Sequence, residues 1–448
     1  MPLSPLEIPI ILRRLVTVLI CVVGAALLTS CNSGGQGVGA TPILTRVRVV
    51  NLVPNAPSIQ VQLDSDQPFV SGLGFEQTTQ YLEVDPGTRE FKVSADGGQT
   101  NVIDVSLPLA KSIDYTFVVY GPVENMGQTL LFDTTTLIPN GGTFDVRVLN
   151  AAIGIVAVDV YLTPPGVDLS VTGPNIANVI FGAASAFFPV AIGDNLELRI
   201  TPHLSKEVIY DAQVGSFGDK ALAQIILYGK ASARLVNAAV LNIDTAGTGQ
   251  VYPSTLAEFK VLNGTSLGAP LNVFVDGTLA LANIPFAGVS NYQKVATGTR
   301  TITVESAASP GATLLSLMVD FAPATDTSIA VSGPAGALRS LVLEDNNLPS
   351  AANRARVRFV NASPDLAAMD VYVNFVLQFA NVASNTASPY AELTADLTGS
   401  VYEFDFNVAG TTTPVLTLPG VTLLAGKTYT VYVVGPAAAP QGVVSQDD

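Results

Sequence analysis

Apolar and polar residues alternate along most of this chain, in short runs separated by glycine, proline and small polar residues. In residues 46–49 valines alternate with arginines, and in residues 59–63 aliphatic residues alternate with glutamines. A period of two is typical of a β-strand with one buried and one solvated face. Helix signals are nearly absent after the first 30 residues. The pattern therefore predicts an all-β protein.

One pair of apolar runs occurs four times. The first run ends each time in an asparagine that follows a basic residue by three positions: Arg48–Asn51, Arg147–Asn150, Lys260–Asn263 and Arg358–Asn361. A second run is centred ten residues after each asparagine, at Val61, Val160, Val273 and Val371. Repetition at intervals of about 100 residues predicts a tandem array of modules of domain size.

Two later markers recur in the same order. The first is a pair of aromatic residues followed by a glycine: Phe75, Tyr81 and Gly87; Phe181, Phe187 and Gly193; Phe286, Tyr292 and Gly298; and, more widely spaced, Phe379, Tyr390 and Gly399. The second is a strongly apolar strand that ends at Gly121, Gly229, Gly333 and Gly435. Seven or so short strands per copy predict an immunoglobulin-like or transthyretin-like antiparallel β-sandwich.

These markers divide the chain into six segments. We predict a lipoprotein signal peptide at residues 1–30, a tether at 31–42 and β-sandwich repeats at 43–138, 143–246, 257–346 and 354–448. Four such modules placed end to end would extend on the order of 130 Å from an anchor.

The N-terminus has the features of an export signal. Arg13 and Arg14 precede an uncharged apolar stretch, Leu15–Leu28, which is too short to span a bilayer. Leu28–Cys31 resembles the lipobox of bacterial lipoproteins, which implies cleavage before Cys31 and acylation of its thiol. A plain signal peptide with an incidental cysteine is the alternative. No aspartate follows Cys31 at residues 32 and 33, which by the sorting rule of such lipoproteins favours the outer membrane and leaves its periplasmic or surface face open.

Cysteine content and net charge exclude several kinds of site and disfavour several kinds of partner. The two cysteines are Cys21, inside the apolar stretch, and Cys31, so the processed modules contain no disulfide, thiolate nucleophile or cysteine metal site. The net charge is −15, and removal of Glu7, Arg13 and Arg14 with the signal peptide takes away +1 and leaves −16. That acidity argues against nucleic acid and anionic lipid head groups as partners.

The chain resembles the family called "domain of unknown function 4397". Arg356–Asp365 and Met369–Val373 are similar to the opening of that repeat, and Gly426–Gly435 is similar to its closing strand. The first copy matches well, whereas the second and third copies depart in the turn after the first strand. The resemblance implies an exported or lipid-anchored bacterial protein of no established activity.

No catalytic, cofactor-binding or metal site is predicted. The only histidine, His203, is expected to be a solvent-facing loop residue. Asp64–Asp66 and Glu344–Asn347 offer oxygen ligands but lack the spacing of a calcium loop, so they are expected to be turns or strand-end caps. Gly97–Gly98 and Gly141–Gly142 are expected to be flexible turns and not phosphate-binding loops.

We predict structural roles for the recurring basic residues and for most tyrosines. Arg48, Arg147, Lys260 and Arg358 are predicted to lie on the solvated face of an outer strand, where positive charge discourages aggregation. The chain has no tryptophan, and Tyr161, Tyr228, Tyr372 and Tyr432 are predicted to pack in the core or across strands.

Three functions stay open at this point. We expect a non-enzymatic, lipid-anchored envelope protein that acts as a modular scaffold or adhesion protein, held to the membrane by its anchor and bound to a protein or polysaccharide partner. The alternative is a glycan- or polymer-binding lipoprotein. A hydrolase is the least favoured, because histidine and cysteine chemistry is missing.

Overall fold

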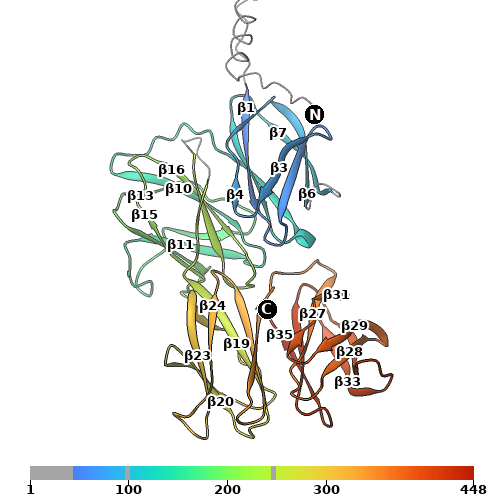
Figure 1. The fold of residues 1–448 in the computed structure, drawn as a ribbon. Coiled ribbons are helices and arrows are strands. Elements are labelled where there is room, and N and C mark those ends of the chain that lie inside the picture. Colours follow the sequence, from blue (N-terminus) through green and yellow to red (C-terminus); the bar gives the residue numbers. More distant parts are fainter. Residues whose placement is uncertain (1–43, 96–100, 244–248) are drawn as a thin grey trace, which may run out of the picture. The chain divides into compact units, whose positions relative to one another are not determined.

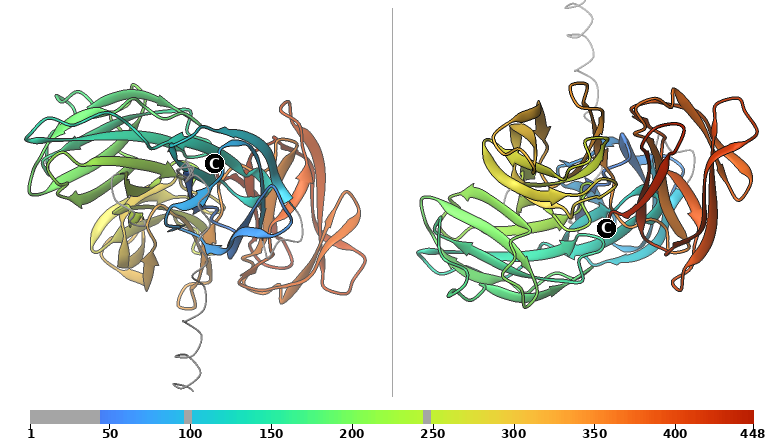
Figure 2. Two further views of the ribbon diagram at one scale, coloured as in Figure 1. Left: turned by 90° about the horizontal axis from the view of Figure 1, so that it is seen from above. Right: turned by 90° about the horizontal axis from the view of Figure 1, so that it is seen from below.

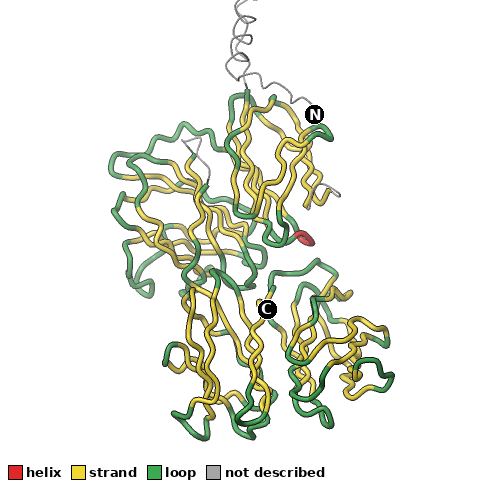
Figure 3. The backbone as a smooth tube through the Cα atoms, viewed as in Figure 1, coloured by secondary structure: helices red, strands yellow, loops and turns green. Residues whose placement is uncertain are grey.

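The computed structural model describes residues 44–95, 101–243 and 249–448, which belong to one compact unit. The predicted signal peptide, the tether with Cys31, and Gly97–Gly98 lie outside the described residues. The described part is almost entirely strand and turn, with one 3-10 turn, η2 (Val123–Asn125) (Figure 3). None of its residues forms a helix long and apolar enough to cross a membrane.

Modules 1 and 2 contain the first 18 strands of the described chain. Module 1 consists of β1 (Thr45–Leu52), β2 (Ser58–Leu63), β3 (Pro68–Gly74), β4 (Gln77–Thr78), β5 (Leu82–Val84), β6 (Gly87–Ala95), β7 (Asn101–Leu109), β8 (Asp114–Tyr120) and β9 (Gly127–Phe132). Module 2 consists of β10 (Thr143–Ala151), β11 (Ala157–Thr163), β12 (Ile176–Ile180), β13 (Phe188–Ala191), β14 (Leu196–Pro202), β15 (Tyr210–Gly215), β16 (Leu222–Tyr228), β17 (Asn237–Asn242) and β18 (Gln250–Tyr252).

Modules 3 and 4 contain the remaining strands. Module 3 consists of β19 (Leu256–Thr265), β20 (Leu271–Val275), β21 (Thr278–Ile284), β22 (Gln293–Ala296), β23 (Gly298–Ser306), β24 (Thr313–Phe321), β25 (Asp326–Gly333) and β26 (Arg339–Asp345). Module 4 consists of β27 (Arg354–Asn361), β28 (Ala368–Val373), β29 (Val376–Ala383), β30 (Thr386–Ala387), β31 (Ala391–Thr394), β32 (Ser400–Val408), β33 (Pro414–Leu423), β34 (Thr428–Val434) and β35 (Gln441–Gln446).

Each module is a sandwich of two sheets, which can be followed in Figures 1 and 2. The opening sheet contains the first strand of the module and has the order β4-β1-β8-β9 in module 1, with β5 also paired to β1. The second sheet has the order β3-β2-β6-β7. The same two sheets recur in the other modules, and in module 4 they are β30-β27-β34-β35, with β31 on β27, and β29-β28-β32-β33. The prediction of tandem β-sandwich modules is confirmed.

The opening strand lies inside its sheet. On one side it pairs with short antiparallel strands, and on the other it pairs in parallel with the closing apolar strand, as β1 does with β8 and β27 with β34. This parallel pair brings the start and the end of each module together, because a parallel partner requires a long crossover. The crossover here is the rest of the sandwich.

The core of each module lies between its two sheets. In module 4, Phe359 of the opening sheet meets Phe404 of the second sheet edge-on, with ring centroids 5.1 Å apart. Burial of each such side chain stabilises the fold by about 1.5–3 kcal/mol.

The opening and closing strands of the opening sheets are also buried on their other face. Val50 and Val118 of module 1 share a cluster with Leu149 and Ile226 of module 2. Modules 3 and 4 share an equivalent cluster that includes Leu262 and Val360. Strands that are buried on both faces have nearly continuous apolar sequences. This burial explains why the closing strands are so strongly apolar. The end-to-end arrangement expected from the sequence is therefore wrong for these two pairs of modules.

Candidate functional sites

The recurring basic residues are buried, and the sequence prediction for them is wrong. Arg48, Arg147, Lys260 and Arg358 are between 0% and 7% exposed. They lie on strands inside the opening sheets, and their side chains belong to the face that packs against the partner module. Alternation identified the two faces of these strands correctly, but it could not reveal that both faces are covered.

Each buried arginine is held first by the strand that runs parallel to its own. The arginine Nε donates to Thr116 Oγ1 from Arg48 at 2.7 Å and to Thr430 Oγ1 from Arg358 at 2.9 Å. In both cases the two residues are register partners. Gln224 takes this role for Arg147, with an Nε–Oε1 distance of 2.8 Å. The closing strand therefore supplies the first acceptor for the arginine of the opening strand.

A carboxylate at the end of a module supplies the balancing charge. Asp133 follows β9, Asp345 ends β26, and Asp447 follows β35; each is at most 3% exposed. A buried ion pair is costly unless its geometry is good and its remaining hydrogen-bonding groups are satisfied. Asp345 meets this condition, because it also accepts hydrogen bonds from Ser328 and Tyr292.

Three of these ion pairs join different modules, whereas the Arg48–Asp133 pair, with Nη2 and Oδ2 3.5 Å apart, lies within module 1. Arg147 of module 2 binds Asp133 of module 1, with Nη2 and Oδ1 2.6 Å apart. Lys260 of module 3 binds Asp447 of module 4, and Arg358 of module 4 binds Asp345 of module 3. Modules 3 and 4 thus exchange cation and carboxylate reciprocally. The matching residue at the end of module 2 is Asp244, which lies outside the described residues.

An aromatic ring covers every one of the four cations. Arg48 and Lys260 lie 4.7 Å from the ring centroids of Tyr81 and Tyr292. Arg147 and Arg358 lie 5.1 Å from those of Phe187 and Tyr390. The four rings are the second aromatic residues of the recurring marker. That marker therefore encodes a lid over the cation, since a cation is attracted to the face of an aromatic ring.

Burial changes the proton affinities in these clusters. Burial raises the pKa of Tyr292, and the charge of Asp345 raises it further. The phenol therefore stays protonated and donates to the carboxylate. Burial opposes the charge of Arg358 and is the largest single effect, but Asp345 together with Tyr390, Tyr432 and Asp447 outweighs it, so the arginine pKa is raised above its ordinary value. In the first pair of modules, burial lowers the pKa of Arg147, and the charge of Asp133 acts against that shift.

The recurring asparagine ties the two sheets of a module together. Asn51 Nδ2 donates to the carbonyl oxygen of Leu73 at 2.8 Å, and Asn263 Nδ2 donates to that of Ile284 at 2.9 Å. Each side-chain oxygen accepts the backbone N–H two residues later, as from Val53. The asparagine is 0% exposed in all four modules. The recurrence of this asparagine at the same place in each module therefore serves the fold.

The other candidates are also structural. His203 lies in a turn with its side chain 29% exposed, and its Nδ1 lies 2.8 Å from Asp159 Oδ1. Asp64 caps a hairpin as predicted, since it accepts the Glu90 N–H at 2.7 Å. Asp345 does more than cap a strand, because it is the partner of Arg358. Among residues 44–95, 101–243 and 249–448, no three His, Cys, Asp or Glu side chains gather as metal ligands.

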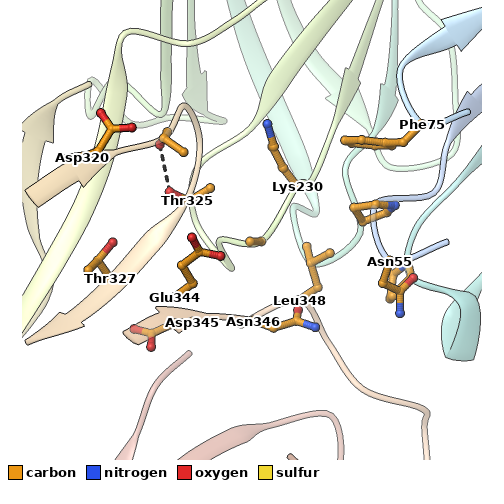
Figure 4. A pocket seen from close by; sticks show the side chains of 14 residues that line it. Asn55, Phe75, Lys230, Asp320, Thr325, Thr327, Glu344, Asp345, Asn346 and Leu348 are labelled. Carbon is orange, nitrogen blue, oxygen red and sulfur yellow. Dashed lines mark hydrogen bonds between the residues drawn. The ribbon is translucent and has the colours of Figure 1, made fainter. Parts of the chain in front are cut away.

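A cavity of about 400 Å³ lies where modules 1, 2 and 3 meet. Phe75, Lys230, Asp320 and Glu344 line it from four separate segments of the chain (Figure 4). Its buried carboxylate, Asp345, is already occupied by Arg358 and its neighbours. The cavity therefore adjoins one of the ion-pair clusters and offers no free buried charge.

The second sheet of module 4 carries an open groove of about 510 Å³. We call it the module 4 groove, and the lining residues that matter here are Tyr372, Phe375, Glu403, Asp405, Asn407 and Thr417. Tyr372, Asp405 and Thr417 are register partners on three adjacent strands, so they form one row across the sheet. Phe375 stands in the turn between β28 and β29 and is 77% exposed.

The sequence matches one family over most of its length. The family is described as "Domain of unknown function (DUF4397)", and the matched residues are 45–161, 257–372 and 355–448. This chain belongs to the DUF4397 family. No protein with a curated description matches it.

Solved structures resemble these DUF4397 modules only distantly. A family 41 carbohydrate-binding module from streptococcal virulence factors, studied for α-glucan recognition, is 13% identical with a TM-score of 0.16, and the match covers 41% of this chain and 93% of that one. A candidate cell adhesion protein from Bacteroides eggerthii is 11% identical with a TM-score of 0.16, and the match covers 70% and 98%.

Sequence reasoning missed the groove in the fourth DUF4397 module. The tyrosine prediction is confirmed for Tyr161, Tyr228 and Tyr432, which are at most 1% exposed. Tyr372 is only partly buried and lines the groove. A signal was present in the turn that follows it: module 3 has Asp276–Gly277 there, whereas module 4 has Asn374–Phe375.

Proposed function

We propose that this protein is a non-enzymatic, lipid-anchored scaffold of the bacterial cell envelope that binds a partner through the second sheets of its modules. The observation that carries the proposal is that the recurring polar residues are buried and hold modules together. Three of the buried cations bind carboxylates of the partner module and so join modules in pairs, and each cation is covered by an aromatic ring of its own module. These residues are therefore committed to holding the modules together and are not available to a substrate.

The second sheets are the surfaces left for binding. Their outermost strands expose residues along much of their length, as β7, β24 and β29 do. The closing strands of the opening sheets, by contrast, are buried on both faces. A chain built in this way presents several sheet faces on a stiff framework, which suits a scaffold or an adhesion protein.

Lipid anchoring rests on the sequence Leu28–Cys31 and the apolar stretch before it. The test is fractionation of cells that express the full chain with Cys31→Ser. We expect the variant to leave the membrane fraction and to lose incorporation of labelled fatty acid.

Cys21→Ala is the matched control, because Cys21 lies in the stretch expected to be removed. This variant should behave as the unaltered chain does. Continued membrane association and labelling of Cys31→Ser would refute the anchor.

A further inference from the structure

We infer that the module 4 groove binds a neutral carbohydrate chain that lies along β32. The inference names a ligand class for the binding role proposed above. It rests on the proposed function only for the place where binding would occur, the cell envelope. Binding by the groove itself does not require the lipid anchor.

The groove presents hydrogen-bond acceptors without any cation. Glu403, Asp405 and Asn407 occupy alternate positions of β32, on the face opposite the core residues Phe404 and Phe406. Alternate residues of a strand lie about 7 Å apart, so the three acceptors form a line along the strand. No lysine or arginine occurs between Arg358 and Lys427. A ligand that carries repeated hydroxyl donors matches such a line.

One of these acceptors is buried and unpaired. Asn407 is 4% exposed, and its Nδ2 donates to the carbonyl oxygen of Thr411 at 3.1 Å. Its Oδ1 has no hydrogen-bond partner in the described chain. A buried polar atom without a partner costs free energy, and a ligand hydroxyl at this position would remove that cost.

The turn beside the groove has a strained backbone at the residue that carries the exposed aromatic ring. Asn374 and Phe375 have φ values of 47° and 67°. Turns with positive φ at both central residues favour asparagine followed by glycine, and a bulky residue with positive φ is an outlier. The same turn in module 3 ends with Gly277 at φ 81°. Strained residues cluster at functional sites, and Phe375 projects at this one.

Phe375 and Tyr372 complete the recognition chemistry. Phe375 is 77% exposed, and the next two residues, Val376 and Leu377, extend its apolar surface along the hairpin. A sugar ring has an apolar face of C–H groups and a rim of hydroxyls, so it can pack on an aromatic ring while it donates to nearby acceptors. A small cation would need convergent carboxylates, and the two in this groove are spread along the strand.

Binding can be measured with the full chain carrying Cys31→Ser, which keeps all modules and removes the lipid. The probes are immobilised linear gluco-, manno- and xylo-oligosaccharides, with poly-lysine as a cationic probe. We expect at least one oligosaccharide to bind, with little dependence on salt. Phe375→Gly should weaken it about tenfold, because it removes the stacking ring. Asn407→Leu should weaken it as well.

The thermal midpoint of unfolding distinguishes a variant that has lost the binding site from one that has lost the fold. Phe375→Gly should leave the thermal midpoint unchanged or raise it, because glycine accepts positive φ without strain. Leu397→Ala, an exposed change elsewhere in module 4, should alter neither binding nor stability. The inference fails if no oligosaccharide binds, if Phe375→Gly binds as well as the parent chain, or if only poly-lysine binds and salt abolishes it. None of these outcomes bears on the membrane fractionation of Cys31→Ser.

Discussion

Arg358 shows how strongly a single side chain can depend on a neighbouring module. It is 3% exposed, and it donates to Thr430 of its own module and to Asp345 of module 3. Loss of one partner of a buried ion pair costs more than loss of both, because it leaves the other charge buried alone.

Replacement of Arg358 by methionine should therefore be severe. We expect Arg358→Met to lower the free energy of unfolding by about 3–5 kcal/mol, since Asp345 is left unpaired. The double variant Arg358→Met/Asp345→Leu should recover much of that loss. Denaturant unfolding of the single and double variants measures the coupling. Additive effects of the two substitutions would contradict the pairing.

Asp326 should make the free energy of unfolding depend on pH. Burial raises the pKa of Asp326 to about 8 from an ordinary value of 3.8, against a hydrogen bond from Asn347. Because the folded pKa is above the unfolded one, the protonated carboxyl stabilises the fold fully below about pH 4. That contribution is lost as the pH rises through about 8.

Asp326→Asn should flatten this dependence, because the amide keeps the neutral form at every pH. The measurement is the free energy of unfolding at several values between pH 4 and pH 9. Asp320→Asn, an exposed change in the same module, is the control and should keep the slope of the parent chain. An equal slope in Asp326→Asn would show that another group is responsible.

At the scale of strands and sheets, the two sheets of a sandwich are joined by more than apolar packing. The asparagine at the end of each opening strand reaches the edge strand of the second sheet, as Asn263 of β19 reaches Ile284 of β21. This link sets the position of one sheet on the other at a fixed point along both strands.

Asn263→Ala should loosen module 3. The Ile284 carbonyl and the Thr265 N–H would both lose their partner in a buried environment. We expect a loss of about 2–3 kcal/mol in the free energy of unfolding, measured by denaturant titration. Asn291→Ala, at an exposed position of the same module, should change it by less than about 0.5 kcal/mol.

Local sequence predicted the strands because their faces and turns are local properties. The alternation of residues 59–63 and the recurring turn glycines were sufficient for this. The burial of Arg48 was not predictable, because it depends on a second module that covers the strand. The groove was equally hidden, since it depends on which residues of β28, β32 and β33 align across the sheet.

At the scale of the whole described chain, modules are linked through buried faces as well as through the backbone. Residues 134–138, between modules 1 and 2, are all exposed, whereas Asn347, Leu348 and Ser350, between modules 3 and 4, are at most 2% exposed. Exposed loops are the preferred sites of proteolytic cleavage. A protease should therefore cut the first connection readily and spare residues 347–350.

Cleavage of the first connection shows whether modules 1 and 2 are held together by their buried faces. A site for a specific protease, inserted among residues 134–138, would cut the backbone between modules 1 and 2. Because the two modules share a hydrophobic cluster and the Arg147–Asp133 ion pair, we predict that the cut chain elutes as one particle in native size-exclusion chromatography. It should separate into two fragments only in denaturant. Release of module 1 under native conditions would show that the buried faces do not hold the two modules together.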